Sequence, residues 1–223
     1  RQVITQTYTV TMTDNNGATV TQPVIVTITG KNDGPTIVVG PAAVPGLGTN
    51  VQTVDTGAVT EDQGVLAGFI SANGVIVFKD VDLIDVHPPA VVLKSSDANV
   101  DLPGFNEGMG PSAANIGTFA LLPVTESSAD TSDIGAVRWT FTLDDNDPIL
   151  QSLAAGQTIT QIYTITITDN NGAQVTRDVT VVITGTNDGP TNTAPTIVVE
   201  LTDAIGEVVE GDSGNVLTDS GTI

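Results

Sequence analysis

A thirty-residue stretch occurs twice in this sequence and decides the fold. Residues 6–35 read QTYTVTMTDNNGATVTQPVIVTITGKNDGP, and residues 161–190 read QIYTITITDNNGAQVTRDVTVVITGTNDGP. The two copies agree at 21 of 30 positions and are offset by 155 residues. Such identity at a fixed offset is the sign of an internal repeat, so we interpret the chain as part of a tandem array.

Each copy is expected to form a β-hairpin. In residues 163–168 apolar side chains alternate with threonines, and a period of two places one set on a buried face and the other in water. The sequence Asp-Asn-Asn-Gly follows at 169–172, and Asn-Gly favours a tight turn because both residues tolerate positive φ. The apolar residues expected to be buried are Tyr163, Ile165, Ile167, Val179, Val181 and Ile183 in the second copy, and Tyr8, Val10, Met12, Val24, Val26 and Ile28 in the first.

The repeat divides the chain into three parts. The sequence PTIVV at 35–39 recurs at 195–199 and marks the start of a repeat. Residues 1–34 are therefore interpreted as the end of a preceding repeat, 35–189 as one complete repeat, and 190–223 as the start of a following one. A partial repeat leaves an unpaired sheet edge and half a core, so both partial repeats are expected to need neighbouring chain for stability.

The rest of the complete repeat is also strand-like. Short apolar runs separated by Gly, Pro, Asn and Asp predict seven to nine strands, and no long segment has helical periodicity. Trp139 alternates with Phe141 and Leu143, so it is expected to be the core tryptophan of an antiparallel sandwich. Residues 149–155 are expected to form one short helical turn, and 95–133 a long loop or an extra hairpin. The apolar runs are 37–39, 74–78, 90–93, 117–122 and 136–143.

Charge and composition exclude several classes of function. The chain has 6 Lys and Arg against 26 Asp and Glu, a net charge of −20, so it is expected to bind neither nucleic acid nor anionic membranes. No run of 18 apolar residues is present, which argues against membrane insertion. With no cysteine and with His87 as its only histidine, the chain is expected not to be an enzyme. It begins with Arg1 and shows no signal peptide, which we interpret as a segment of a longer polypeptide.

Acidic residues gather near the junctions between repeats. Asn32-Asp33-Gly34-Pro35 follows the last strand of one repeat, and the same four residues recur at 187–190. All four are turn residues, so one interpretation is a simple turn. The other is a linker stiffened by calcium, for which carboxylate and amide oxygens are suitable ligands. Asp80 and Asp82 would share one face of a strand, where they either repel until a cation or proton intervenes or are merely solvated.

The order of motifs along the whole chain resembles the VCBS repeat family. Such repeats occur in tandem in giant bacterial surface proteins, many of them RTX-type adhesins exported by type I secretion. The resemblance implies an immunoglobulin-like or cadherin-like β-sandwich that extends a stalk. The insertion at 95–133 departs from the pattern, and the RTX nonapeptide GGxGxD is not present in the sequence. The motifs are VTED at 59–62, FKDVD at 78–82, WTFTL at 139–143, LAAGQ at 153–157, the hairpin at 163–172 and ITGTND at 183–188.

The cadherin-like junction implies calcium shared between an Asn-Asp linker and carboxylates of the flanking domains. The expected function is a calcium-stiffened stalk module of an extracellular adhesin on a bacterial surface, with neighbouring repeats as its partners. One alternative is a filament or sheath subunit in which partial repeats of identical chains pair, and another is a calcium-dependent glycan-binding module that uses 95–133. The implied ligands are Asn32 and Asp33 with Glu61, Asp62, Asp80, Asp82 and Asp85, and, at the next junction, Asn187 and Asp188 with Glu210 and Asp212.

Overall fold

The computed structural model describes residues 2–127, 129 and 131–188. The start of the third repeat, with Glu210 and Asp212, lies outside the described residues. The first hairpin consists of β1 (Val3–Thr13) and β2 (Thr19–Thr29). The complete repeat contains β3 (Thr36–Val38), β4 (Ala42–Val44), β5 (Gly48–Val51), β6 (Thr56–Thr60), β7 (Phe69–Lys79), β8 (Pro89–Ala98), β9 (Gly108–Met109), β10 (Thr118–Leu121), β11 (Ile134–Asp144), β12 (Thr158–Thr168) and β13 (Gln174–Thr184), with the 3-10 helices η1 (Gly110–Ser112) and η2 (Leu150–Ser152).

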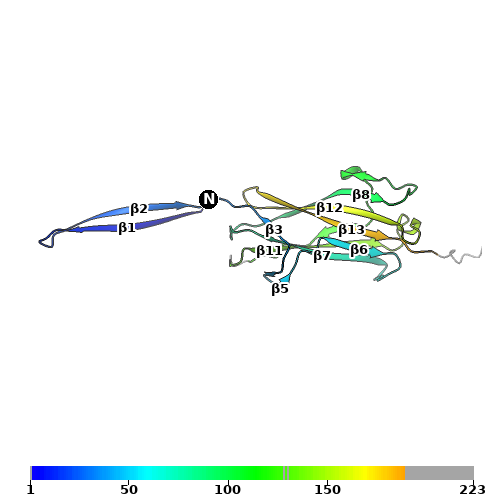
Figure 1. Ribbon diagram of the computed structural model, residues 1–223, viewed down its shortest axis with the longest axis horizontal. Helices are drawn as coiled ribbons and strands as arrows, with labels where there is room; N and C mark the ends of the chain where they lie inside the picture. Colours follow the sequence, from blue (N-terminus) through cyan, green and yellow to red (C-terminus); the bar gives the residue numbers. More distant parts are fainter. Residues whose placement is uncertain (1, 128, 130, 189–223) are drawn as a thin grey trace, which may run out of the picture. The chain divides into compact units, whose positions relative to one another are not determined.

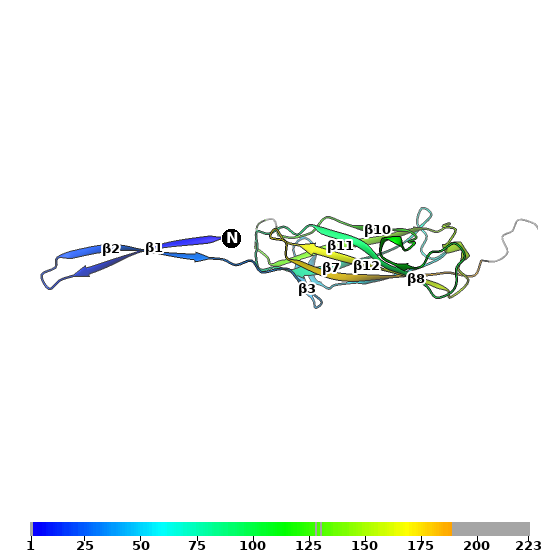
Figure 2. The same cartoon turned by 90° about the horizontal axis from the view of Figure 1, so that it is seen from above.

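Two sheets build the complete repeat. One has the strand order β10-β11-β7-β3 and the other the order β6-β13-β12-β8-β9, and β8 lies beside β12 in both views (Figures 1 and 2). A small hairpin of β4 and β5 forms a further two-stranded sheet. The strand pairs are antiparallel except for β6 and β13, which run parallel. The predicted all-β fold with antiparallel sheets is confirmed, and β6 is a parallel exception to it.

Both sheets contribute to one hydrophobic core. Phe78, Trp139 and Phe141 from one sheet are at most 1% exposed, and so are four isoleucines of β12 and β13 in the other, namely Ile159, Ile165, Ile167 and Ile183. Trp139 is fully buried as predicted, and its indole Nε1 donates a hydrogen bond of 2.8 Å to the carbonyl of Val54. A Cβ on Gly74 would come within 2.5 Å of the indole ring, so the close approach of β7 to this tryptophan requires glycine.

The second copy of the hairpin shows the predicted alternation. Every second residue of β12 from Ile159 to Ile167 is buried, and the intervening side chains are half-buried. On β13 the residues Val179, Val181 and Ile183 are fully buried. The period of two therefore identified the core-facing side of this hairpin correctly.

The segment 95–133 contributes more regular structure than a loop. It contains the end of β8 together with β9, η1 and β10, and β10 pairs with β11 as an edge strand. The complete repeat consequently has eleven described strands, β3 to β13, where seven to nine were predicted. The short helical turn predicted at 149–155 is present as η2.

The first copy of the hairpin has no described neighbour in a sheet. Tyr8 lies opposite Val24 in β1 and β2, as Tyr163 lies opposite Val179 in β12 and β13. Among the described strands, however, β1 and β2 pair only with each other (Figure 1). The prediction that this copy buries its apolar face is wrong for the described chain, because nothing there corresponds to the strands that cover β12 and β13. Tyr8, Val10, Met12, Val24, Val26 and Ile28 are 39–65% exposed.

Candidate functional site

Three segments meet at the end of the sandwich where the linker enters. They are the linker 30–35, the loop 80–88 after β7, and the turn 169–172 between β12 and β13. The linker leads into β3, whose first residue, Thr36, pairs with Lys79 at the end of β7. We call this the entry end, and we call the opposite end, where β13 leads into the outgoing linker, the exit end.

The entry end contains a close group of carboxylates, Asp80, Asp85 and Asp169, here called the aspartate cluster. One oxygen from each lies within 4.8 Å of the others. Asp80 and Asp169 are each 4% exposed, and Asp85 is half-buried. Carboxylates this close and this sheltered from water repel one another unless donors, a proton or a cation offset their charges.

Asp169 is held ionised by donors around it. Its Oδ1 accepts backbone N–H bonds of 2.8 Å each from Asn171 and Ala173, and its Oδ2 accepts 2.7 Å from the Asn32 amide. Burial acts to raise the pKa of Asp169, but these hydrogen bonds outweigh it and hold the pKa below its ordinary value. Asp169 is therefore a fixed negative charge in the cluster.

Asp85 carries the opposite shift. Its partial burial raises its pKa above the ordinary value, and repulsion from Asp169, Asp82 and Asp80 raises it further. The side chain of Asn170 donates 3.2 Å to its Oδ1, which opposes this rise. Asp85 is thus the member of the cluster that a nearby cation would keep charged.

A turn, and not a shared strand face, brings Asp82 next to Asp80. Both residues follow the end of β7, and the backbone N–H of Asp82 donates 2.9 Å to Oδ1 of Asp80. The prediction that the two carboxylates share one face of a strand is therefore wrong. The chain turns at Asp80 because an Asp side chain can bond the backbone two residues on.

The predicted linker residues lie at this site. Besides its bond to Asp169, Asn32 accepts a hydrogen bond from the side chain of Asn171. The backbone N–H of Asp33 donates 2.7 Å to Oδ2 of Asp82. A Cβ on Gly34 would lie 2.9 Å from that of Ala173, so glycine in the Asn-Asp-Gly-Pro sequence allows the linker to lie against the turn.

Glu61 and Asp62 lie at the exit end instead. Glu61 is fully buried and accepts 2.8 Å from the backbone N–H of Thr186 and 2.7 Å from the Gln151 amide. The backbone N–H of Asp62 donates 3.0 Å to Oδ1 of Asp145. The implied meeting of Glu61 and Asp62 with Asn32 and Asp33 is therefore wrong.

The parallel pairing of β6 explains this separation. Because Thr60 lies opposite Thr184, the residues after β6 meet the linker that leaves the repeat. The predicted ligands thus divide between the two ends. Asn187 and Asp188, which follow Thr186, are exposed, and their predicted partners Glu210 and Asp212 lie outside the described residues.

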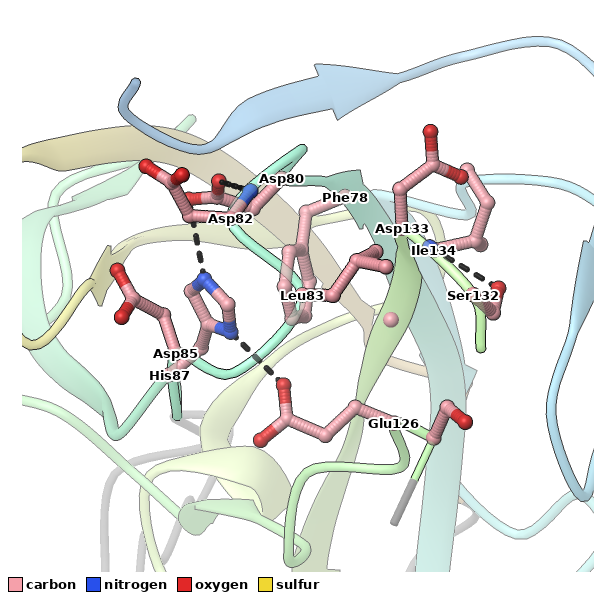
Figure 3. Close-up of a pocket in the computed structure, with 12 residues that line it drawn as sticks. Phe78, Asp80, Asp82, Leu83, Asp85, His87, Glu126, Ser132, Asp133 and Ile134 are labelled. Carbon is pink, nitrogen blue, oxygen red and sulfur yellow. Dashed lines mark hydrogen bonds and ion pairs between the residues drawn. The ribbon is translucent and has the colours of Figure 1, made fainter. Parts of the chain in front are cut away.

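His87 is a member of the site that the sequence did not reveal. It is 4% exposed, and it lies between Glu126, at 2.8 Å from Nδ1, and Asp80, at 3.2 Å from Nε2 (Figure 3). Its ring also packs on Phe78 at a centroid distance of 4.8 Å. Burial acts to lower the pKa of His87, but the hydrogen bonds and charges of Glu126 and Asp80 raise it above its ordinary value. Glu126 is 39 positions away in sequence, and no local pattern links the two residues.

The donor set at the entry end fits a hard divalent cation. The nearest groups are carboxylate oxygens, with Asp82 and the amide of Asn32 beside them. Calcium takes six to eight oxygen ligands, whereas zinc and copper favour nitrogen and sulfur. The one histidine here is bonded to carboxylates through both nitrogens, so oxygen atoms are the ligands that the described residues of this site would offer to a metal.

Comparisons with known proteins leave the family open. No family model matches the chain, and no curated protein matches it. Among solved structures, it is similar to the CooA pilin subunit of enterotoxigenic Escherichia coli at 14% identity and a TM-score of 0.30, covering 66% of this chain and 98% of that one. It is also similar to PapD-like domain 7 of human CEP192 at 13% identity and a TM-score of 0.29, covering 73% and 92%. At these TM-scores neither similarity bears on function. The two described helices are single 3-10 turns, and neither is long enough to cross a membrane.

Proposed function

We propose that this chain is a stalk segment of an extracellular bacterial adhesin, built of immunoglobulin-like repeats in tandem and stiffened by calcium at their junctions. The observation that carries this proposal is the pair of hairpins. One sequence pattern forms the centre of a five-stranded sheet in one copy and is left without a described sheet in the other. The resemblance of the motifs to VCBS repeats agrees with this interpretation.

The complete repeat shows what the first hairpin lacks. In it, β8 lines one edge of the hairpin, β6 lines part of the other, and β7 and β11 cover the apolar face through the shared core. The same register in β1 and β2 predicts the same three coverings. A hairpin of this kind has a use only inside an assembled repeat, which supports a role in an array.

The aspartate cluster supports the calcium part of the proposal. Its members come from a loop and a hairpin turn, and the linker is hydrogen-bonded to both segments. Calcium, when bound, would supply the positive charge that offsets the repulsion among these carboxylates. Asp169 and Asp82 hold the linker by accepting bonds from Asn32 and Asp33, so a site here would couple the cation to the linker's orientation.

The same geometry argues against catalysis. Both ring nitrogens of His87 are bonded to carboxylates, and its ring packs on Phe78, so neither nitrogen is available to a substrate. The insertion 95–133, the place where a glycan site was considered, supplies edge strands to both sheets and Glu126 to His87. These are structural uses, and they favour a mechanical role over a binding one.

A filament subunit is the second candidate, because β1 and β2 have exposed edges. In such a filament residues 1–34 of one chain would pair with residues 190–223 of another. The stalk is the first proposal, because the linker 30–35 joins one copy of the hairpin directly to the next repeat within the same chain.

Thermal unfolding tests the calcium-stiffened stalk. The midpoint for the full chain is expected to rise markedly in calcium at about 5 mM, which exceeds the roughly 10⁻⁴–10⁻³ M at which extracellular modules bind it. Magnesium at the same concentration and excess EDTA are the controls. An unchanged midpoint would make the carboxylates a solubility coat and contradict the proposal. Sedimentation in calcium as a monomer would remove the filament, and concentration-dependent growth would favour it.

A further inference from the structure

The loop after β7 turns its acidic residues inward and its apolar residues outward. Asp80 is buried and Asp82 and Asp85 are half-buried. The apolar residues between and beside them are 42–57% exposed, the reverse of the usual arrangement. We call this surface the entry patch, and its members are Val81, Leu83, Ile84 and Val86.

A second apolar surface lies at the exit end. Val65 is 42% exposed, Leu66 80% and Phe69 48%, and we call these three residues the exit patch. The backbone N–H of Leu66 donates 2.8 Å to the carbonyl of Phe69, and the backbone N–H of Phe69 donates 3.0 Å to the carbonyl of Leu66, so a tight turn holds Leu66 in place. The eleven residues of β7 separate the two patches, since this strand starts at Phe69 and ends at Lys79.

Backbone strain marks the exit loop. In the described chain, the non-glycine residues with positive φ are Asn50, Asp62 (φ 60°) and Ala67 (φ 53°); Asp62 precedes the exit patch, and Ala67 lies between its members Leu66 and Phe69. Ala67 occupies the left-handed region without the side-chain hydrogen bonding that favours Asn or Asp there. A loop held in this conformation to expose a leucine needs a compensating contact, and strain of this kind concentrates at functional sites.

The covalent arrangement brings the two kinds of patch together. Between β2, which ends at Thr29, and β3, which starts at Thr36, the linker has only six residues. An extended linker of that length spans at most about 20 Å, so the exit end of one repeat stays close to the entry end of the next.

We propose that the exit patch of each repeat packs on the entry patch of the next, with a second copy of the repeat as the partner. This inference rests on the proposed tandem stalk and adds a direct protein contact to it. The two patches differ, so the contact is head-to-tail and extends into a linear array. The entry patch consists of the outward side chains of the loop that carries Asp80 and Asp85, so the contact also shelters the aspartate cluster.

A two-repeat chain tests this contact. A second copy of residues 35–189 is inserted after Gly189 of the full chain, giving two complete repeats in natural linkage. Val92, which is 62% exposed on β8, is replaced by cysteine in each repeat and spin-labelled, which is specific because the sequence has no other cysteine. The distance distribution between the two labels is measured in calcium and in EDTA.

The variants use the fact that the contact is directional, from the exit patch of the first repeat to the entry patch of the second. Leu66→Ser in the first repeat with Ile84→Ser in the second alters the patches that face each other. The matched control places Leu66→Ser in the second repeat and Ile84→Ser in the first, where the patches face no complete repeat. Both residues are exposed, so all variants are expected to keep the unfolding midpoint of the parent chain.

The expected result in calcium is a narrow distribution for the parent and the control, and its loss in the facing variant. An equally narrow distribution in the facing variant overturns the contact, and so does equal broadening in the control. If the distance distribution of the parent narrows on calcium addition and that of the facing variant narrows equally, the proposed calcium-stiffened stalk is supported and only the contact between the patches is contradicted. A parent that stays broad with and without calcium overturns both.

Discussion

The two hairpins are nearly the same molecule in two environments. They share 21 of 30 residues, the same pairing register and the same turn, in which Asp14 and Asp169 each accept bonds from backbone N–H groups two and four residues on. Each also has a tyrosine whose hydroxyl is hydrogen-bonded to the glutamine two residues back, at 2.7 Å for Tyr8 and 2.9 Å for Tyr163. Yet six apolar side chains are 39–65% exposed in one copy and at most 4% exposed in the other.

Alternation therefore specifies a hairpin and its apolar face, whereas burial of that face depends on other strands. Burying a Val, Ile or Met side chain contributes about 1.5–3 kcal/mol, so the six together are worth on the order of 10 kcal/mol. That is similar to the whole stability of a typical domain, about 5–15 kcal/mol. Covering the apolar face of the first hairpin with other strands would therefore be strongly favourable in free energy.

The largest expected effect comes from the same substitution made in each copy. Val181→Asp would bury a carboxylate in the core, and it is expected to destabilise the complete repeat by on the order of 4 kcal/mol. Val26→Asp, at the equivalent exposed position of the first hairpin, is expected to leave the unfolding midpoint of the complete repeat unchanged. Urea unfolding followed by Trp139 fluorescence measures both. Equal destabilisation by the two variants would mean that the hairpins share one environment after all.

The turns allow a similar comparison for calcium. Asp169→Asn removes a charge from the aspartate cluster, and it is expected to weaken calcium binding at least about tenfold. Asp14→Asn alters the same turn where the described chain supplies no other cluster member, so it is expected to leave this binding unchanged. Calorimetric titration distinguishes the two. Identical calcium affinities of the two variants would show that calcium does not bind at the aspartate cluster.

The entry end should also make the complete repeat sensitive to pH. Because folding raises the pKa of His87, its stabilising effect is fully present below the ordinary value of 6.5 and is lost as pH rises through the folded-state pKa. In EDTA the unfolding midpoint is therefore expected to fall as the pH rises above about 6.5. His87→Gln should flatten this slope. A slope that survives the substitution would assign the pH dependence to another group.

Asp85 and Asp169 act with opposite signs at lower pH. Because folding lowers the pKa of Asp169, this residue stabilises the fold at pH values above its unfolded-state pKa, and the stabilisation is lost as pH falls through the folded-state pKa. Because folding raises the pKa of Asp85, the ionised form of Asp85 destabilises the fold. Because the pKa of Asp85 is raised above the ordinary carboxyl value, the part of the slope that His87→Gln removes, and not the choice of pH, identifies the histidine.

The smallest effect is expected on the outer face of the five-stranded sheet. Lys94 pairs with Asp178 at 2.5 Å, and both side chains are more than 40% exposed. The position equivalent to Asp178 in the first hairpin is Pro23, so the pair belongs to the complete repeat alone. Lys94→Ala is expected to change the free energy of unfolding by no more than about 0.5–1 kcal/mol, because exposed ion pairs contribute little. A loss comparable to that of Val181→Asp would show that this face is covered.

The sequence was sufficient wherever the signal was local. The period of two in residues 158–184, the turn residues at 169–172 and the alternation around Trp139 each predicted structure that is present. The Asn-Asp linker also lies beside the carboxylates after β7, as the family resemblance implied for Asn32, Asp33, Asp80, Asp82 and Asp85.

The features that the sequence did not predict depend on pairing between strands far apart in the sequence. Glu61 was predicted to lie at the entry end, but the parallel pairing of β6 with β13 places it at the exit end. No sequence pattern near Glu61 indicates that pairing. His87 lies in the loop after β7, and Glu126 follows Thr125, which bridges to Ala136 of β11, so the two residues meet through the pairing of β11 with β7. The exposure of Tyr8 and Val24 depends on strands elsewhere in the chain, which a local pattern does not report.

Amide hydrogen exchange tests whether the two hairpins are equivalent parts of one repeat. A copy of residues 35–155 is joined ahead of Arg1, which supplies the first hairpin with counterparts of β3 to β11 in the order that the repeat offset gives. Exchange protection over residues 3–29 is then compared with that over 158–184, in this extended chain and in the original one. Protection of the first hairpin is predicted to rise to the level of the second. If it stays as fast as in the original chain while 158–184 remains protected, the two hairpins are not equivalent parts of one repeat, and the tandem-stalk account is contradicted.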